Sequence, residues 1–190
     1  HFDYVDPAAP KGGTLRLRNP DRRSSFDKFN PWTTRGNAPA GVLIWMVDGL
    51  CHLAQDEPMT MYALIAESLL VAGDFSSASF RIDERARFNN GDPVLAEDVR
   101  HSWSMLAGKG ASPAYQTLVG GIESVVVVDR LTVRFNFRDK SRDQVFTAGT
   151  MPIFSRKWGQ VAGWAPGQPV RPFNEVVTEY PITAGPYMIE

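Results

Sequence analysis

The chain has 190 residues, of which 43% are hydrophobic and 11% aromatic, enough to bury a core as one or two small domains. Its 20 Lys and Arg residues balance 21 Asp and Glu residues to a formal net charge of -1, so no general attraction to nucleic acid or to an anionic membrane is expected. No apolar run approaches the roughly 18 residues that a membrane-spanning helix needs, so no such helix is predicted.

Two single residues bear on where the protein works. The chain begins with His1 rather than Met, which agrees with a secreted protein whose signal peptide has been removed and equally with a trimmed chain. Cys51 is the only cysteine, so an intrachain disulfide is impossible and the C-x-x-C spacing of metal sites is absent. We expect Cys51 to be a small core residue.

The first part of the chain combines a strand, a long loop and a helix. Residues 14–18 alternate between apolar and polar side chains and predict a half-buried strand. Residues 21–41 are rich in Pro, Asn, Gly, Thr and Arg and predict a long connection, a kind of segment that often carries function. Apolar residues recur at helical spacing over 38–50, which predicts a buried helix that ends near Gly49, with Trp45 in the core.

The middle of the chain predicts a sheet with a helix. Residues 78–83 alternate as a strand does, and the turn residues 89–93 precede a helical apolar stripe over 96–106. Residues 122–128 and 131–137 form a predicted hairpin through Asp129-Arg130. The side chains expected to face the core from its second strand are Leu131, Val133, Phe135 and Phe137. Strands and helices are therefore interspersed, and the fold class is α/β, with a mixed sheet of the α+β kind.

Motifs of catalysis and of nucleotide binding are absent from the sequence. Neither phosphate-binding glycine pattern occurs, nor does the G-x-S-x-G motif of a serine nucleophile. The spacing closest to a metal site is His52 with Asp56, which is common by chance. We therefore expect no enzyme activity, no catalytic residue, no metal and no cofactor.

Aromatic and polar side chains gather in the long loop. Phe26, Phe29, Asn30, Trp32 and Arg35 are the residues that could line a ligand groove. Among them we take Phe29, Asn30 and Trp32 as candidate ligand-binding residues. The alternative is that these side chains pin the loop to the core, which is the more common role of an apolar residue in a loop.

Three segments carry a resemblance to a known family. They are ARFNNGDPVLAEDV over 86–99, DGL over 48–50 followed by AESL over 66–69, and AGPY over 184–187. In order and spacing they resemble the bacterial extracellular solute-binding proteins of family 5, the peptide, dipeptide and nickel receptors of ABC importers. The opening residues 2–15 resemble the branch of this family named for microcin C uptake, whose members take up longer peptides.

Two positions depart from the pattern of the family. Asn90 stands where the family usually has Asp before Gly, and Leu95 stands where Thr or Ser commonly caps the helix. Loss of such a cap costs about 0.5–2 kcal/mol. Both changes affect the turn and the start of the helix, so they leave the fold assignment intact.

The resemblance implies that these 190 residues are the N-terminal part of a longer, two-lobed protein with a periplasmic-binding-protein type II fold. Residues 1–50 with 170–190 would belong to the main sheet of one lobe, and residues 51–169 to a smaller inserted subdomain, with a boundary in the Gly- and Pro-rich stretch 159–172. Residues that fix peptide termini by charge would lie in the second lobe.

The implied function is capture of peptides in the periplasm and their delivery to the permease subunits of an ABC importer in the inner membrane. At full length the protein is expected to be a monomer. One alternative is another solute on the same scaffold, such as a nickel complex, heme, a sugar or an opine. Less favoured are a secreted hydrolase and a purely structural or adhesive domain.

Overall fold

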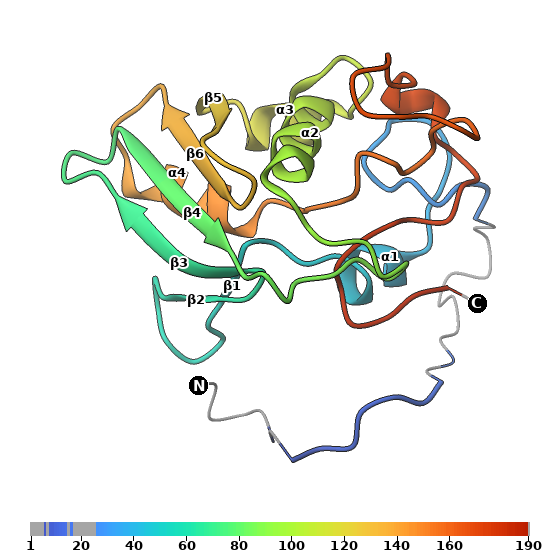
Figure 1. The fold of residues 1–190 in the computed structure, drawn as a ribbon, viewed down its shortest axis with the longest axis horizontal. Helices are drawn as coiled ribbons and strands as arrows, with labels where there is room; N and C mark the ends of the chain where they lie inside the picture. The colour runs from blue at the N-terminus through green and yellow to red at the C-terminus, as the bar shows by residue number, and fades with distance from the viewer. Residues whose placement is uncertain (1–5, 7, 15, 17–25, 190) are drawn as a thin grey trace.

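The computed structural model of the protein describes residues 6, 8–14, 16 and 26–189 (Figure 1). Its helices are α1 (Ala40–Trp45), α2 (Ala96–Ala107), α3 (Pro113–Leu118), α4 (Arg142–Thr150) and the 3-10 helix η1 (Phe173–Glu175). Its strands are β1 (Cys51–Leu53), β2 (Met61–Ala63), β3 (Ala66–Val71), β4 (Ser77–Ile82), β5 (Ile122–Val127) and β6 (Thr132–Phe137). This mixture of helices and strands confirms the predicted fold class.

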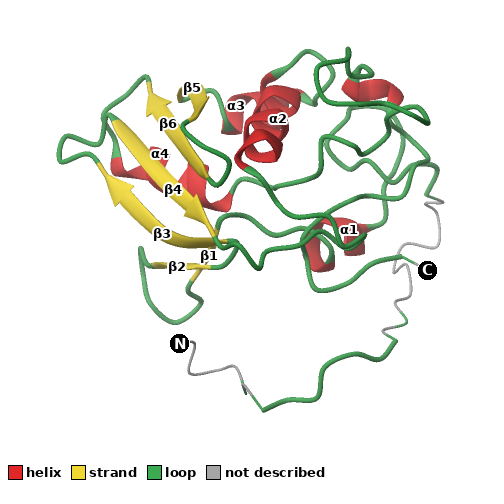
Figure 2. Ribbon diagram, in the orientation of Figure 1, coloured by secondary structure: helices red, strands yellow, loops and turns green. Residues whose placement is uncertain are grey.

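One antiparallel sheet of four strands organises the molecule, in the order β3-β4-β6-β5 (Figure 2). The predicted hairpin is present as β5 and β6, and the predicted strand over 78–83 is β4. The separate pair β1 and β2 is also antiparallel, with His52 opposite Tyr62. All strand pairing in the described residues is therefore antiparallel, which lets one face of a sheet remain in water.

Alternating residues of β4 and β6 explain why these strands lie at the centre of the sheet. Phe80 and Phe135 are fully buried, and their rings meet edge to face at a centroid distance of 5.6 Å. The side chains expected to face inward from the second strand of the hairpin, Leu131, Val133, Phe135 and Phe137, are all buried. Helix α2 packs against β5 and β6, and its buried residues are Ala96, Asp98, Val99, Ser102 and Leu106.

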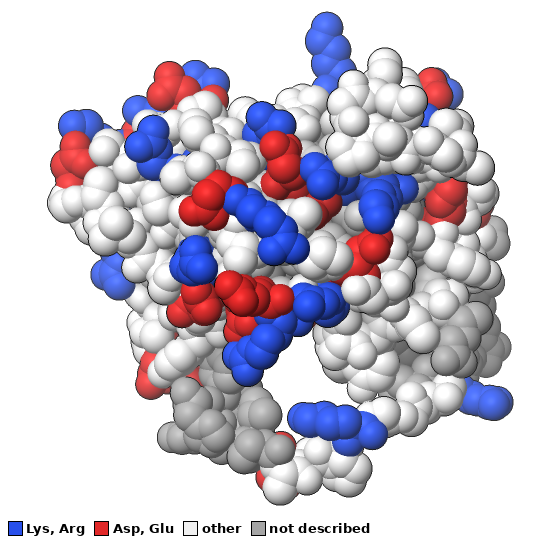
Figure 3. Space-filling model, in the orientation of Figure 1, with Lys and Arg blue, Asp and Glu red and all other residues white. Residues whose placement is uncertain are grey.

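The exposed surfaces of the sheet and of α2 carry charges of both signs. Arg81 and Glu67 pair at 2.6 Å between neighbouring strands, and Arg100 and Glu97 pair at 2.6 Å on α2. Figure 3 shows such side chains interspersed over this side of the molecule. Exposed ion pairs of this kind contribute only about 0–1 kcal/mol each to the free energy of unfolding. They indicate that this surface faces solvent.

Helix α2 begins without the usual side-chain cap. Leu95 has no side-chain oxygen, but the buried carboxylate of Asp98 accepts a hydrogen bond of 3.0 Å from the Leu95 backbone N–H. The same carboxylate accepts the N–H of Arg156 at 3.0 Å. Half of a capping arrangement is thus retained despite the departure at Leu95.

A second part of the core is a cluster of aromatic rings. Trp32 stacks on Phe154 at a centroid distance of 4.9 Å, and Phe154 stacks on Phe173 at 5.4 Å. Trp158 meets Trp32 edge to face at 5.6 Å. This cluster joins the long loop to segments more than a hundred residues later in the chain.

The predicted helix over 38–50 is wrong in its length, because α1 ends at Trp45. The carbonyls of Trp45 and Met46 accept hydrogen bonds from the N–H groups of Tyr187 and Gly185, at 3.2 and 2.9 Å. The end of α1 is therefore fixed by a distant segment instead of by further helix. Trp45, which we expected in the core, is 39% exposed.

Two further sequence expectations concern the first half of the chain and membranes. Most of the strand predicted over 14–18 lies outside the described residues, and Thr14 and Arg16, which are described, are not in a strand. Across the described part of the chain, no helix has the length and apolar character that crossing a membrane requires.

Candidate functional site

The candidate site is a groove beside α1 that is lined mainly by apolar and aromatic side chains, here called the aromatic groove. Its volume is about 670 Å³. The residues that line it are Gly13, Thr14, Phe26, Phe29, Pro39, Gly41, Val42, Trp45, Met46, Tyr180, Pro186, Tyr187, Met188 and Ile189. Gly13 and Thr14 come from the start of the chain, and the others from the long loop, from α1 and from the last ten residues of the described chain.

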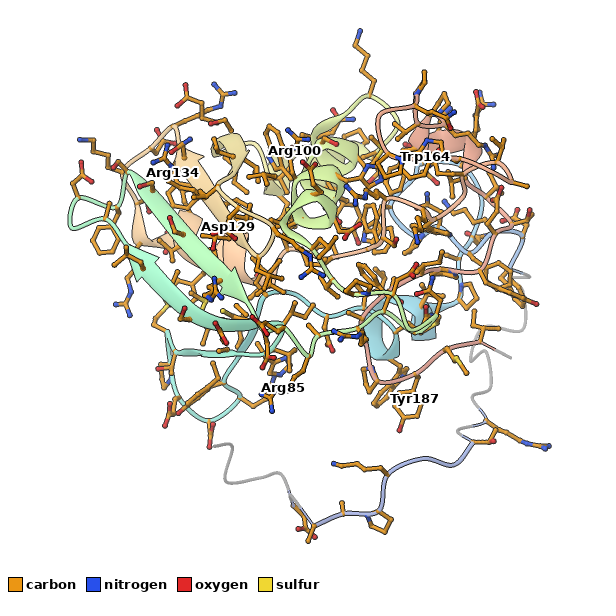
Figure 4. The ribbon with its side chains drawn as sticks, in the orientation of Figure 1. Arg85, Arg100, Asp129, Arg134, Trp164 and Tyr187 are labelled. Carbon is orange, nitrogen blue, oxygen red and sulfur yellow. The ribbon has the colours of Figure 1, made fainter. Side chains whose placement is uncertain are left out.

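Two groups of rings form the walls of the aromatic groove. On one wall Phe29 lies between Phe26, at a centroid distance of 5.6 Å, and Tyr180, at 5.0 Å. On the other wall Trp45 meets Tyr187 edge to face at 5.9 Å. Figure 4 shows Tyr187 beside α1, with its side chain directed away from the body of the molecule.

The backbone holds both walls in place. The N–H of Phe29 donates to the carbonyl of Val177 at 2.7 Å, which ties the long loop to the chain just before Tyr180. The hydrogen bond from the Tyr187 N–H to Trp45 does the same for the opposite wall. Hydrogen bonds between distant segments thus fix the position of each ring-bearing backbone.

The aromatic groove offers mainly apolar and aromatic surface with a few polar groups. Among the described residues that line it none carries a charge, and the polar groups are the hydroxyls of Thr14, Tyr180 and Tyr187 and the indole N–H of Trp45. Tyr180 is 59% exposed, so its ring is available to a ligand. Exposed rings offer apolar contact and stacking, and such a surface suits the side chains of an uncharged or amphipathic ligand.

The three candidate residues of the long loop occupy different positions. Phe29 is half-buried and lines the aromatic groove. Asn30 is fully buried: its side-chain amide donates to the carbonyl of Phe173 at 3.1 Å, and its side-chain oxygen accepts the N–H of Trp32 at 3.1 Å. Trp32 is fully buried in the aromatic cluster with Phe154. Ligand contact by these residues stays a prediction, while Asn30 and Trp32 visibly anchor the loop.

Other lining residues were not singled out from the sequence. Tyr180 and Tyr187 belong to the segment that returns to α1, and only the fold brings them to the long loop. The apolar neighbours of Trp45 in the sequence favour a place in the core, whereas the fold leaves its side chain 39% exposed. The unusual aromatic content of the long loop was the one local signal, and it identified the Phe26 and Phe29 wall.

Buried titratable groups lie away from the aromatic groove. Burial raises the pKa of the Cys51 thiol to about 11, and the residue packs in the core as expected. Burial also lowers the pKa of His101 to about 4, with the nearby Arg156 adding to the shift. Among the described residues there is no group of three His, Cys, Asp or Glu side chains placed to hold a metal ion.

Comparison with known proteins places this architecture in a family. The chain is 31% identical, over its whole length, to the "Probable peptide-binding protein YejA" of Agrobacterium fabrum. It spans only 30% of the length of that relative.

Two solved structures show the same fold. NikA of Brucella suis, in complex with Fe(III)-EDTA, has a TM-score of 0.65 at 20% identity, covering 86% of this chain and 31% of that one. The dipeptide binding protein of a Pseudoalteromonas species, in complex with Met-Leu, has a TM-score of 0.63 at 21% identity, covering 85% of this chain and 34% of that one.

The sequence pattern of "Bacterial extracellular solute-binding proteins, family 5 Middle" matches residues 60–190. The chain therefore belongs to the family 5 extracellular solute-binding proteins and forms part of a type II periplasmic-binding-protein fold.

Proposed function

We propose that the chain is part of the substrate-binding component of a bacterial ABC importer, which captures peptides in the periplasm and delivers them to the permease subunits in the inner membrane. The observation that carries this proposal is the aromatic groove, whose walls present the exposed rings of Phe26, Trp45, Tyr180 and Tyr187. Membership of a solute-binding family and the peptide-binding name of the Agrobacterium relative support it.

In this proposal the rings contact apolar side chains of an extended peptide. Rings at fixed backbone positions supply contact area at a small entropic cost, because each has only two side-chain torsions to restrict. The aromatic groove is open to solvent, so tight binding would need a second lobe to close over the ligand and exclude water. Closure would then couple occupancy to recognition by the permease.

The proposed domain organisation assigns residues 1–50 and 170–190 to the main-sheet part of the lobe, and residues 51–169 to an inserted subdomain. Two features support this division. Strands β1–β6 and helices α2–α4 all fall within 51–169. The segment around Gly185 and Tyr187 returns to α1, which joins the two outer ranges to each other. We propose that the ligand binds in the aromatic groove, which is lined by residues of these two outer ranges.

Within this site Phe29 is proposed as a contact residue, and Asn30 and Trp32 as residues that act through it. Asn30 bridges the loop to η1 with its amide, and Trp32 fills the aromatic cluster beneath. A change at either residue would displace the loop and with it Phe29. Their effect on binding would therefore be accompanied by a loss of stability, unlike that of Phe29.

Thermal unfolding of the protein at its natural full length, with and without ligand, tests the proposal. Dipeptides, tripeptides, longer peptides, a nickel chelate and heme would each be added. A ligand present at about 100 times its Kd adds roughly 2.7 kcal/mol to the free energy of unfolding. Stabilisation by peptides supports the peptide role. Stabilisation by the nickel chelate or heme alone assigns another solute. Hydrolysis of the added peptides would contradict both binding functions and indicate a hydrolase.

Two matched variants place the ligand. Phe29→Ala removes a wall of the aromatic groove, and we expect at least about tenfold weaker peptide binding, since truncation of a central aromatic contact costs on the order of 2 kcal/mol. Phe75→Ala removes an exposed ring between β3 and β4, far along the chain from the groove lining, and should leave peptide affinity unchanged. Equal affinities of the two variants would remove the aromatic groove from the proposal.

A further inference from the structure

A second cavity lies beside the same loop and differs from the aromatic groove in its chemistry. Its volume is about 600 Å³. The residues that line it are Asp27, Lys28, Thr33, Thr34, Arg35, Gly36, Lys109, Gly110, Asn174 and Val177. Three of them are cations and one is an acid, whereas none of the described residues that line the aromatic groove is charged. This cavity is here called the basic cavity.

Lys28 is a buried cation whose partners among the described residues are neutral. The residue is 3% exposed, and its ammonium donates to the carbonyl of Thr33 at 2.8 Å and to the Thr33 hydroxyl at 3.0 Å. Within the described residues no carboxylate lies within 4.0 Å of this ammonium group. Since an ammonium group has three donors, one donor remains beyond the two that Thr33 accepts.

Burial of a cation without an anionic partner is costly. Removal of the charge from water lowers the pKa of Lys28, and the neighbouring Asp27 opposes this shift only in part. Lysine side chains usually extend to solvent and leave only their alkyl stem covered. The Lys28 side chain is instead buried in the wall of the cavity. An anion bound in this cavity would compensate for the water that the ammonium group has lost.

The rim of the basic cavity adds two exposed cations from different segments. Arg35 comes from the long loop and Lys109 from the turn after α2. Neither forms an ion pair with an acid among the described residues, in contrast to Arg81, Arg100 and Lys140. Both are therefore available to a ligand at the mouth.

Asp27, the one acid among the described residues that line the basic cavity, forms its hydrogen bond within the long loop. One carboxylate oxygen of Asp27 accepts the N–H of Asn37 at 2.7 Å. Gly36, with a φ of +80°, brings its backbone against this oxygen so closely that a Cβ would lie 2.5 Å from it. Asp27 thus closes the turn over 27–37 and fixes the backbone between Lys28 and Arg35.

We infer that the basic cavity binds an oxyanion group, a carboxylate or a phosphate, through the Lys28 ammonium, with Arg35 and Lys109 completing its coordination from the rim. The carboxylate and phosphate groups share the geometry that a guanidinium recognises with two parallel hydrogen bonds. Asn174 also lines the cavity, and its side-chain amide is a neutral group that can donate a hydrogen bond. This inference is independent of the peptide role, because it concerns other side chains and a charged group.

Isothermal titration of the full-length protein with inorganic phosphate, and separately with succinate, tests the inference. Lys28→Met keeps the buried alkyl stem and removes the charge, and Arg35→Gln and Lys109→Gln change exposed residues whose loss should not affect folding. We expect each rim variant to weaken anion binding, and Lys28→Met to weaken it at least about tenfold, as befits loss of a charge-assisted hydrogen bond.

Matched controls separate the basic cavity from general charge. Arg134→Gln and Lys11→Gln remove exposed cations elsewhere and should leave anion affinity unchanged. Should Lys28→Met fail to fold, the double rim variant Arg35→Gln/Lys109→Gln decides alone. Binding of phosphate but not succinate assigns a phosphate ligand, and the converse assigns a carboxylate. Absence of binding by both anions, or equal binding by the rim variants and the controls, overturns the inference.

Discussion

The backbone N–H of Phe154 donates a hydrogen bond of 3.0 Å to the hydroxyl oxygen of Ser102, which lies on α2. The same oxygen lies 2.8 Å from the carbonyl of Asp98 and 3.0 Å from that of Phe154, either of which can accept its proton. All three groups are buried in the protein interior. One hydroxyl therefore fixes the chain after α4 to α2, and with it the ring of Phe154 on which Trp32 stacks.

We expect Ser102→Ala to lower the free energy of unfolding by about 1–3 kcal/mol, because the N–H of Phe154 would remain buried without an acceptor. Chemical denaturation measures this change. Ser104→Ala is the matched control, since within the described part of the chain its hydroxyl bonds to the carbonyl of His101 in the same helix and to no other segment. A loss no larger for Ser102→Ala than for the control would show that the hydroxyl is not a link between the segments.

His101 should make stability depend on pH. Burial lowers its pKa from 6.5 to about 4 in the folded protein, so between these values the unfolded chain binds a proton that the folded protein does not. The free energy of unfolding should therefore fall as pH decreases from 6.5 towards 4, by up to about 1.4 kcal/mol per pH unit. Denaturation of His101→Gln across this range should show a shallower decline, and parallel curves would contradict the assignment.

Gly185 is needed where the last described segment meets α1. A Cβ at this position would lie 2.2 Å from the backbone carbon of Met46 and 2.3 Å from its oxygen. We expect Gly185→Ala to cost about 1–3 kcal/mol by forcing the two backbones apart, and to weaken any ligand of the aromatic groove by displacing Tyr187. Gly73→Ala, where a Cβ meets nothing within 4 Å, should be close to neutral in both denaturation and binding.

Arg171 holds together the segment that precedes Tyr180. Its guanidinium donates to the carbonyl of Gly159 at 2.7 Å and to that of Glu175 at 2.5 Å, and it pairs with Glu179. Lysine cannot reach these acceptors at once, so Arg171→Lys should lower stability by about 1 kcal/mol and speed proteolytic cleavage between 159 and 180. Arg85→Lys, an exposed pair with Asp83, is the control. Equal cleavage rates in the two variants would oppose this role.

Elements with strong local signals could be predicted from the sequence. The apolar stripe of α2 and the alternation in β6 each face a single buried surface, so their periodicity matched the structure. Strand β3 gave no such signal, because a bulge between Ala66 and Ser68 breaks the alternation and the neighbouring residues Leu69 and Leu70 are both exposed. Its pairing with β4 depends on neighbours rather than on its own pattern.

The candidate site was predictable only in part, and for a related reason. Phe29 belongs to a loop of unusual composition, which marked it from sequence alone. The end of α1 at Trp45 is set by carbonyls that bond to Gly185 and Tyr187, so neither the helix length nor the exposure of Trp45 could follow from local residues. The opposite wall of the aromatic groove exists only once these distant segments meet.

The burial of the single thiol gives the protein an internal reporter of opening. Cys51 is 5% exposed, and its raised pKa keeps it protonated at neutral pH, so an alkylating reagent meets neither an accessible nor a nucleophilic sulfur. Strand β1 packs against α4, where a Cβ at Gly149 would lie 3.4 Å from the Cβ of Cys51, so modification requires these two elements to separate. The rate at which the reagent labels Cys51 therefore measures how often these elements separate in the unaltered protein, without any introduced probe.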